Sequence, residues 1–101
     1  MHLHKVKLLR VVASASLQDD VVRVLEGAGV RGHTISRATG VGSHGTRAGD
    51  EPGSGNVIIE VVAAEGTAVD ALQAVHRSLF GPHAVIAYLL DAEVLRREKF
   101  L

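Results

Sequence analysis

A glycine-rich segment holds the residues of this sequence that are best suited to chemistry. Gly40–Gly45 (GVGSHG) has its glycines in the spacing of a GxGxxG motif, directly after a predicted strand. A dinucleotide-binding fingerprint must also open a helix, and residues 46–53, which contain a proline and further glycines, cannot form one. Glycine backbone amides can still approach an anion, with Ser43, His44 and Arg47 as additional donors. The segment therefore predicts either a phosphate-cradling loop or a simple flexible hairpin loop.

Charged residues at two further places are candidates for binding. Glu60 interrupts the most apolar stretch of the chain, residues 57–64 (VIIEVVAA), and a buried carboxylate needs a partner. It is either paired with an arginine or part of a site. Arg96, Arg97 and Lys99 form a basic cluster near the C-terminus, for which a solvated tail is the simplest interpretation.

No constellation in the sequence indicates an enzyme or a metal site. The six histidines show no HxxxH spacing and no carboxylate partners, although His2 and His4 share one face of a predicted strand. The absence of cysteine excludes disulfides, a thiolate metal site and a cysteine nucleophile. No Ser-His-Asp, paired-carboxylate or P-loop arrangement occurs. We therefore expect neither catalysis nor a metal.

Length and composition indicate one globular domain over residues 1–101, with 47% hydrophobic and 22% charged residues. Eleven Lys and Arg balance eleven Asp and Glu, and only 3% of residues are aromatic, so nucleic acid is not an expected partner. No apolar run reaches the roughly 18 residues of a membrane span, and no signal-peptide pattern precedes the first strand. These features favour a cytoplasmic protein.

Apolar periodicity predicts two strand–helix–strand units joined by a long loop. Ser16 with Asp19, and Thr67 with Asp70, have the spacing of N-terminal helix caps, and the glycines after residue 26 offer a stop to the first helix. A loop at about 41–55 is much longer than a hairpin connection, which marks it as functional or flexible. The predicted elements are strands at 5–13, 30–39, 57–64 and 84–90, a helix at 17–28, a second helix whose apolar face spans 68–79, and a charged tail at 91–101.

This order predicts an α+β ferredoxin-like βαβ-βαβ sandwich with a four-stranded antiparallel sheet. Two helices cover only one sheet face, yet residues 57–59 (VII) and 84–87 (AVIA) are apolar on both faces. The second face therefore needs a cover, and we expect a homo-oligomer that packs its sheets together. The alternative is a C-terminal tail folded under the sheet, although the charges of this tail argue against full coverage.

Five segments carry a family resemblance: Gly32–Ile35 (GHTI), Gly40–Arg47 (GVGSHGTR), Ile59–Val62 (IEVV), Ala84–Tyr88 (AVIAY) and Ala92–Phe100 (AEVLRREKF). Together they resemble the PII signalling superfamily over nearly the whole chain. The tail most resembles its PII-like carbon branch, which includes carboxysome-associated PII proteins and regulators of the sodium–bicarbonate transporter. The resemblance implies a ferredoxin-like homotrimer that binds adenine nucleotides in clefts between subunits.

The resemblance also assigns candidate site residues. Backbone at Gly32, His33 and Thr34 would contact adenine, and basic residues near the C-terminus would reach the nucleotide from the neighbouring chain. Bicarbonate would bind at Gly42, Ser43 and Arg47. We include Glu60 among the nucleotide-binding candidates. The remaining candidates are the phosphate-holding loop base, Gly40, Val41, Gly42, Ser43, His44 and Arg47, and the C-terminal Arg96 and Lys99.

Departures from the family narrow the expected ligand. Residues 80–83 (FGPH) lack the lysine and glycines that typical PII proteins use on ATP, so ADP, AMP or cyclic AMP fits better than ATP or 2-oxoglutarate. The long loop contains no tyrosine, which excludes uridylylation. The resemblance thus implies a signalling protein, with nucleotide alone or together with bicarbonate, that acts through its loop on a membrane bicarbonate transporter or a carboxysome-associated protein.

Two other classes share the fold. A trimeric divalent-metal-tolerance protein would need a cluster of metal ligands. A small enzyme such as an acylphosphatase would need an arginine in an anion-binding loop after the first strand, and residues 13–16 (ASAS) contain none. The metal-tolerance protein remains the alternative to the signalling protein.

Overall fold

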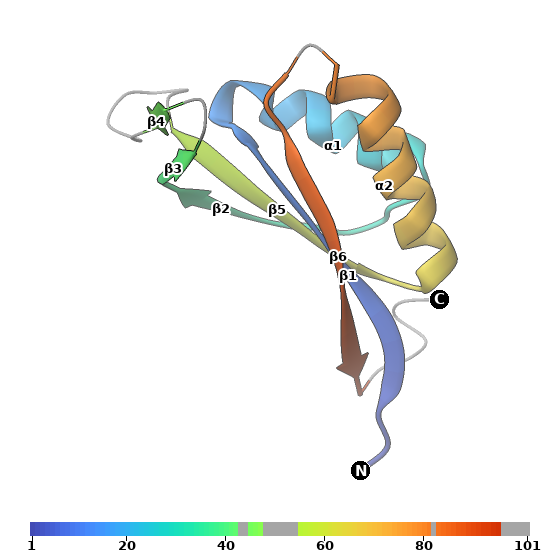
Figure 1. Ribbon diagram of the computed structural model, residues 1–101. Coiled ribbons are helices and arrows are strands. Elements are labelled where there is room, and N and C mark those ends of the chain that lie inside the picture. Colours follow the sequence, from blue (N-terminus) through green and yellow to red (C-terminus); the bar gives the residue numbers. More distant parts are fainter. Residues whose placement is uncertain (43–44, 48–54, 82, 96–101) are drawn as a thin grey trace.

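The computed structural model describes residues 1–42, 45–47, 55–81 and 83–95 (Figure 1). The chain forms two helices, a short 3₁₀ helix at Ala15–Leu17, a four-stranded sheet and a separate two-stranded hairpin within these residues. The elements in chain order are β1 (His4–Ser14), α1 (Gln18–Gly27), β2 (Thr34–Ala38), β3 (Gly40–Gly42), β4 (Gly45–Arg47), β5 (Asn56–Ala63), α2 (Glu65–Leu79) and β6 (Ile86–Val94).

The main sheet has the strand order β2-β5-β1-β6, and all of its neighbouring strands are antiparallel. Helices α1 and α2 lie together on one face of this sheet (Figure 1). Each helix connects two strands of the same direction that are not neighbours, because a strand of the other unit lies between them. The predicted α+β ferredoxin-like sandwich is therefore confirmed.

The core lies between the helices and the odd-numbered residues of β1 and β5. From Leu9 onward, burial alternates along β1, and it alternates along all of β5, as expected for a sheet with one covered face. The helices contribute one apolar stripe each. The side chains with almost no exposed surface include Leu9, Val11, Val21, Leu25, Val57, Ile59, Val61 and Val75.

The opposite face of the sheet, which we call the open face, carries the even-numbered residues of the same strands. No helix of the described chain covers it, and large apolar side chains remain exposed there, with Ile86 at 60% and Leu90 at 41%. The expectation of an apolar second face is thus confirmed. The alternative cover is the tail at 91–101, of which residues 91–94 belong to the last strand and residues 96–101 lie outside the described residues.

Glycine ends α1 as the sequence predicts. Gly29 has a φ of 96°, in the left-handed region, and its N–H donates to Glu26 O at 3.1 Å. The N–H of Val30 donates to Leu25 O at 3.1 Å, which completes a Schellman motif. A side chain at residue 29 would strain this turn, whereas Gly27 lies in the last turn of the helix.

Both predicted helix caps are wrong. Ser16 lies inside the 3₁₀ turn, where its hydroxyl lies 3.2 Å from that of Ser14, and α1 has no side-chain cap. Thr67 falls in the first turn of α2, whose N-cap position is held by Ala64. The cap spacing fails because each helical segment begins earlier than predicted, so the hydroxyl no longer stands at the cap position.

The last strand is displaced from its predicted range. β6 begins at Ile86 rather than 84 and continues to Val94, which takes Asp91 to Val94 out of the predicted tail. These residues pair with His4 to Lys7 at the start of β1. The strand continues through these partly polar residues because the ladder satisfies their backbone N–H and C=O groups. β2 is shorter than predicted, because residues 30–33 form the connection from α1.

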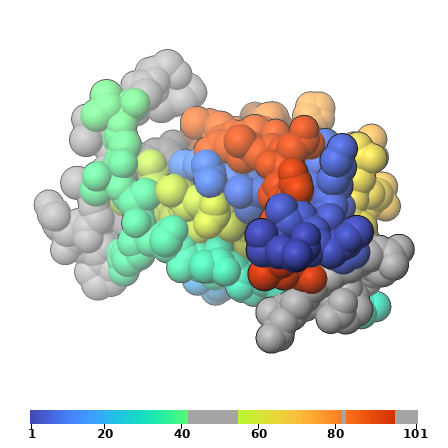
Figure 2. Space-filling model, turned by 90° about the horizontal axis from the view of Figure 1, so that it is seen from below, coloured from blue at the N-terminus to red at the C-terminus, as the bar shows by residue number. Residues whose placement is uncertain are grey.

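β1 and β6 extend together beyond α2, and Figure 2, seen from below, shows the start of β1 against the end of β6. An ion pair joins the strands here: the ammonium of Lys7 donates to the carboxylate of Asp91 and lies 3.9 Å from that of Glu65. The hydrogen bond from Lys7 lowers the pKa of Asp91 and raises that of Lys7. Both groups are therefore charged at neutral pH.

Replacing Leu9 tests the position of the core. We expect Leu9→Ala to lower the free energy of unfolding by about 2–5 kcal/mol, because it removes a fully buried side chain and leaves a cavity. Urea unfolding followed by circular dichroism measures this loss. The control, Val41→Ala at an 81% exposed position, should change the value by less than about 0.5 kcal/mol. Equal effects of the two variants would contradict the core assignment.

The Lys7–Asp91 pair predicts a pH dependence of stability. Because the pKa of Asp91 is lowered on folding, its contribution is present above the ordinary carboxyl pKa of about 3.9 and is lost as the pH falls through the folded value. The urea midpoint of Asp91→Asn should lie slightly below wild type at pH 7, and the difference should shrink as the pH falls below about 3.9 and vanish once the pH is below the folded pKa of Asp91. A difference that grows as the pH falls would contradict this sign.

Candidate functional site

The predicted adenine contacts lie at the start of the edge strand β2. Gly32 and His33 belong to the connection after α1, Thr34 is the first residue of β2, and all three are exposed. Within the described ranges, β2 has only β5 as a sheet neighbour, so the backbone groups on its other side have no strand partner there and can bind a ligand or another chain. The predicted contacts at this position are therefore accessible.

The predicted phosphate-binding segment begins as a hairpin rather than as a loop without strands. β3 and β4 pair Gly40 with Arg47, Val41 with Thr46 and Gly42 with Gly45. The sequence predicted no strands here, because glycine-rich segments have low β-propensity. Gly40 packs close to Asn56 at the start of β5: a Cβ at residue 40 would lie 3.5 Å from Asn56 Nδ2, an ordinary contact distance.

Some predicted site residues lie outside the described residues. They are Ser43 and His44 in the glycine-rich segment, and Arg96 and Lys99 near the C-terminus. Arg47 is described by its backbone, as the last residue of β4. The roles assigned to these residues stay predictions.

The structure brings only part of the predicted site together within one chain. Thr34 lies directly opposite Glu60 in the β2–β5 ladder. The segment Gly32–Thr34 and the hairpin at Gly40–Arg47 lie at the two ends of β2, separated by roughly 20 Å of extended chain between Thr34 and Gly40. A ligand that touches both segments must therefore lie along the exposed edge of β2.

Glu60 is held by Arg10, the residue opposite it on β1. Arg10 Nε donates to Glu60 Oε2 at 2.9 Å, and a second guanidinium nitrogen lies 2.8 Å from the same oxygen. Both side chains are about one-third exposed, on the open face. Glu60 was predicted either to pair with an arginine or to belong to a site. The structure shows the pairing with Arg10, and it also places Glu60 opposite Thr34, one of the predicted adenine contacts.

Tyr88, on β6, completes this network from the other side of Arg10. A guanidinium nitrogen of Arg10 donates to Tyr88 Oη at 3.1 Å, and Arg10 Cζ lies 5.5 Å from the centre of the tyrosine ring. The hydrogen bonds with Tyr88 and then with Glu60 raise the pKa of Arg10. The guanidinium is thus a permanent positive charge at the centre of the open face.

Sequence reasoning assigned no role to Arg10 and Tyr88. The signal was nevertheless present, since Arg10 interrupts the first apolar strand as Glu60 interrupts the third. A carboxylate and an arginine that interrupt two apolar strands can form an ion pair, so that neither charge is left without a partner on the sheet. Their pairing depends on the strand order, which places β1 between β5 and β6.

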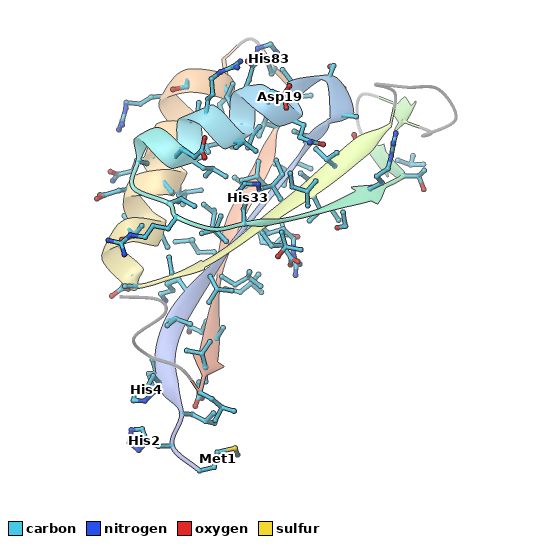
Figure 3. The ribbon with its side chains drawn as sticks, turned by 180° about the vertical axis from the view of Figure 1, so that it is seen from behind. Met1, His2, His4, Asp19, His33 and His83 are labelled. Carbon is cyan, nitrogen blue, oxygen red and sulfur yellow. The ribbon has the colours of Figure 1, made fainter. Side chains whose placement is uncertain are left out.

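The histidines form no common site in the part of the chain that the structure describes. His2 and His4 lie together at the start of β1 with ring centres 4.6 Å apart, far from His33 and His83 (Figure 3). His76 packs against Phe80 at the end of α2. Within the described ranges, no group of three or more His, Cys, Asp or Glu side chains is placed to hold a metal ion.

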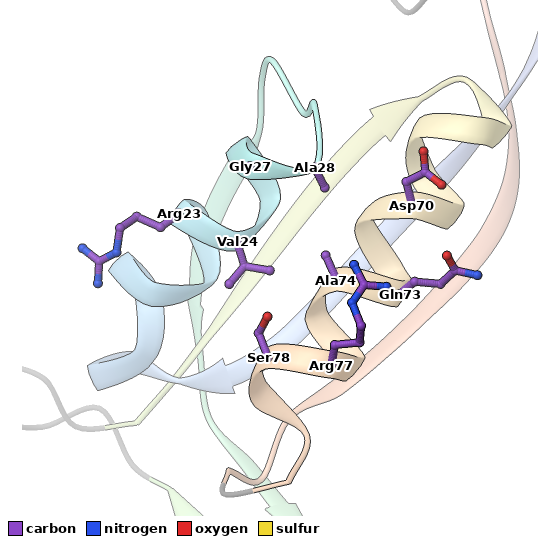
Figure 4. Close-up of a pocket in the computed structure, with 9 residues that line it drawn as sticks. All are labelled: Arg23, Val24, Gly27, Ala28, Asp70, Gln73, Ala74, Arg77 and Ser78. Carbon is purple, nitrogen blue, oxygen red and sulfur yellow. The ribbon is translucent and has the colours of Figure 1, made fainter.

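A shallow groove of about 410 Å³ lies between α1 and α2, on the helical side of the molecule (Figure 4). None of the predicted site residues lines it. Arg23 at its rim is paired with Asp20, and in Figure 4 the Arg23 side chain points away from α2. The floor is formed by small residues, including Gly27, Ala28 and Ala74. The groove is therefore separate from both the open face and the edge of β2.

None of the described helices is long and apolar enough to cross a membrane. The sequence pattern of the family "Nitrogen regulatory protein P-II" matches residues 6–99, which is nearly the whole chain. The chain belongs to the P-II family. The predicted resemblance to PII proteins is thereby confirmed, and the predicted homotrimer is consistent with this family.

Solved structures of PII-like proteins share the fold over the full length of the chain. A protein described as PII-like and signalling, from Thermus thermophilus, is 36% identical over 100% of both chains, with a TM-score of 0.84. CPII from Thiomonas intermedia, bound to ADP, AMP and bicarbonate, is 25% identical over 98% of this chain and 96% of its own, with a TM-score of 0.88.

A second CPII structure, bound to ADP and bicarbonate, is 26% identical over 99% of this chain and 98% of its own, with a TM-score of 0.88. Among curated proteins, no relative matches this sequence. The P-II assignment therefore rests on the family pattern and on the shared fold.

Proposed function

We propose that this P-II family member is a cytoplasmic, homotrimeric signalling protein that binds ADP, AMP or cyclic AMP in clefts between its subunits, together with bicarbonate. The single observation that carries the proposal is the match to CPII, since a protein of the same family and fold over 98% of this chain is bound to ADP, AMP and bicarbonate. The protein acts as a regulator and not as an enzyme.

The geometry of β2 supports a site shared between subunits. Gly32–Thr34 and the hairpin at Gly40–Arg47 lie at opposite ends of the exposed edge of β2. No other strand among the described residues pairs with the outer side of this edge. A neighbouring copy packed along the sheet supplies the second wall. Its C-terminal Arg96 and Lys99 are the proposed basic contacts to the phosphates.

The anion-binding part of the site lies at the base of the long segment. Backbone amides of Gly40, Val41 and Gly42, with Ser43, His44 and Arg47, hold the phosphates, and bicarbonate binds at Gly42, Ser43 and Arg47. Fixing the backbone of a peptide segment costs about 1–2 kcal/mol per residue, so charge-assisted contacts to the ligand must offset that cost. Ligand binding thus sets the conformation that a partner meets.

The proposed partner is a component of inorganic-carbon uptake or carboxysome metabolism, such as a membrane bicarbonate transporter. The bicarbonate present in two CPII structures supports a link to inorganic carbon. No arrangement among the described side chains favours the metal-tolerance alternative.

A thermal-shift screen with AMP, cyclic AMP, ADP and ATP, each with and without bicarbonate, tests the ligand. A ligand that binds only the folded state raises the melting temperature, and at 100 times its Kd it stabilises by about 2.7 kcal/mol. We expect ADP or AMP to give a larger shift than ATP, with a further rise when bicarbonate is added. No shift with any nucleotide at millimolar concentration would contradict the proposal.

Arg47→Ala tests the phosphate contact. We expect nucleotide affinity to fall about tenfold or more, because a hydrogen bond to a charged group contributes roughly 1.5–3 kcal/mol. Isothermal titration calorimetry measures the affinity. The matched control is Arg77→Ala, which removes an exposed arginine on α2, beside the helical groove. An unchanged affinity for Arg47→Ala would remove this residue from the site.

A further inference from the structure

The open face is organised in rows of side chains that run across the sheet. The ladder registers place Tyr88, Arg10, Glu60 and Thr34 side by side, one from each strand, and we call these four residues the polar row. The rows on either side of it are almost wholly apolar. One contains Leu90, Leu8 and Val62, and the other contains Ile86, Val12, Ile58 and Ser36.

The polar row is neutral and already linked within one chain. Arg10 donates to Glu60 at 2.9 Å and to Tyr88 at 3.1 Å, so its charge is met by one carboxylate and one hydroxyl. These bonds use Oε2 of Glu60, and among the described contacts Oε1 accepts none. The row can therefore both donate and accept further hydrogen bonds when another surface covers it.

From this arrangement we infer that Arg10, Glu60 and Tyr88 set the register in which copies of this chain pack their open faces together. The inference rests on the trimer of the proposed function, and it adds which residues select the packing. The occupant of the open face is a second copy, because the donors and acceptors of this row, one positive charge, one negative charge and unused polar atoms, can meet the acceptors and donors of the same row on the next copy.

The flanking apolar rows explain why the polar row selects one register. Neighbouring rows lie about 6.6 Å apart along a strand, which is two residues. A slip of one row would place the Arg10–Glu60 pair of one copy against leucine, valine or isoleucine of the next. The charges would then lose water without gaining partners, which is costly, whereas the correct register keeps polar atoms together.

A buried ion pair of this kind contributes more to specificity than to stability. Desolvation offsets much of the attraction between the two charges, so an apolar pair of similar volume holds surfaces together equally well. Removing only one partner is different, because it leaves a single charge buried without compensation. This contrast makes the inference testable with single and double variants.

Native mass spectrometry and analytical ultracentrifugation across a protein dilution series test the inference. We expect Arg10→Met to need about tenfold or more protein for half-assembly, because Glu60 is left as an unpaired charge at the interface. The double variant Arg10→Met with Glu60→Met should assemble again, but into a mixture of oligomer sizes. Tyr88→Phe, which removes only one hydroxyl, should weaken assembly by a few-fold.

Lys7→Met is the matched control. Lys7 of β1 pairs with Asp91 of β6, but at odd-numbered positions on the other face of the sheet. It should therefore leave assembly unchanged. Far-UV circular dichroism of each variant separates loss of assembly from loss of fold, and Tyr88→Phe keeps the test available if Arg10→Met does not fold.

The outcomes separate this inference from the proposed function. A wild-type protein that remains a single chain would contradict the trimer itself. A wild-type trimer with Arg10→Met and Tyr88→Phe assembling at wild-type concentrations, or with the double variant forming only trimers, would overturn the role of the polar row and leave the trimer intact.

Discussion

The structure depends on one geometric constraint, which is that two helices cover only one face of a four-stranded sheet. The covered face receives the odd-numbered residues from Leu9 to Ala13 in β1 and from Val57 to Ala63 in β5, and these form the core with α1 and α2. The open face receives equally apolar neighbours such as Ile58, Ile86 and Leu90. Burial of apolar surface is the main driving force of folding and association, and so this second face favours a partner.

The same sheet separates its two tasks by position. The middle strands β5 and β1 carry the charged pair Glu60–Arg10 at the centre of the open face. The edge strand β2 keeps one side of its backbone free and leads at both ends into segments that the family resemblance assigns to the nucleotide. Because Thr34 lies opposite Glu60, the proposed ligand edge and the proposed contact between copies meet in one row of the sheet.

The P-II assignment connects these features to signalling. The proposed site is completed by a neighbouring subunit and exists only in the assembled protein, so the proposed packing of the open face and the proposed binding of ligand are linked by mass action. The helical groove, in contrast, shares no residue with either surface. In the proposed function, the helices support the sheet, while the sheet and the segments attached to it bind ligand and neighbouring copies.

Much of the fold follows from the sequence alone, because alternation and helical periodicity are local patterns. The runs around Lys5–Ala13 and 57–64 predicted β1 and β5 nearly to the residue, and the glycine at 29 predicted the end of α1. The helix starts were wrong at Ser16 and Thr67, since cap spacing specifies a start only if the hydroxyl stands just outside the first turn. The β3–β4 hairpin was not predicted, because its glycines carry little strand signal.

The sequence by itself determined that one side of a small α+β sheet is apolar without a cover, and that Glu60 needs a partner. Only the tertiary structure decided that the partner is Arg10, fifty residues away, and that Tyr88 of β6 accepts a hydrogen bond from Arg10 on the side away from Glu60. The tertiary structure also showed that residues 91–94, predicted as the start of the C-terminal tail, belong to β6. These facts depend on the strand order and register, which arise from contacts between distant segments and leave no local pattern in the chain.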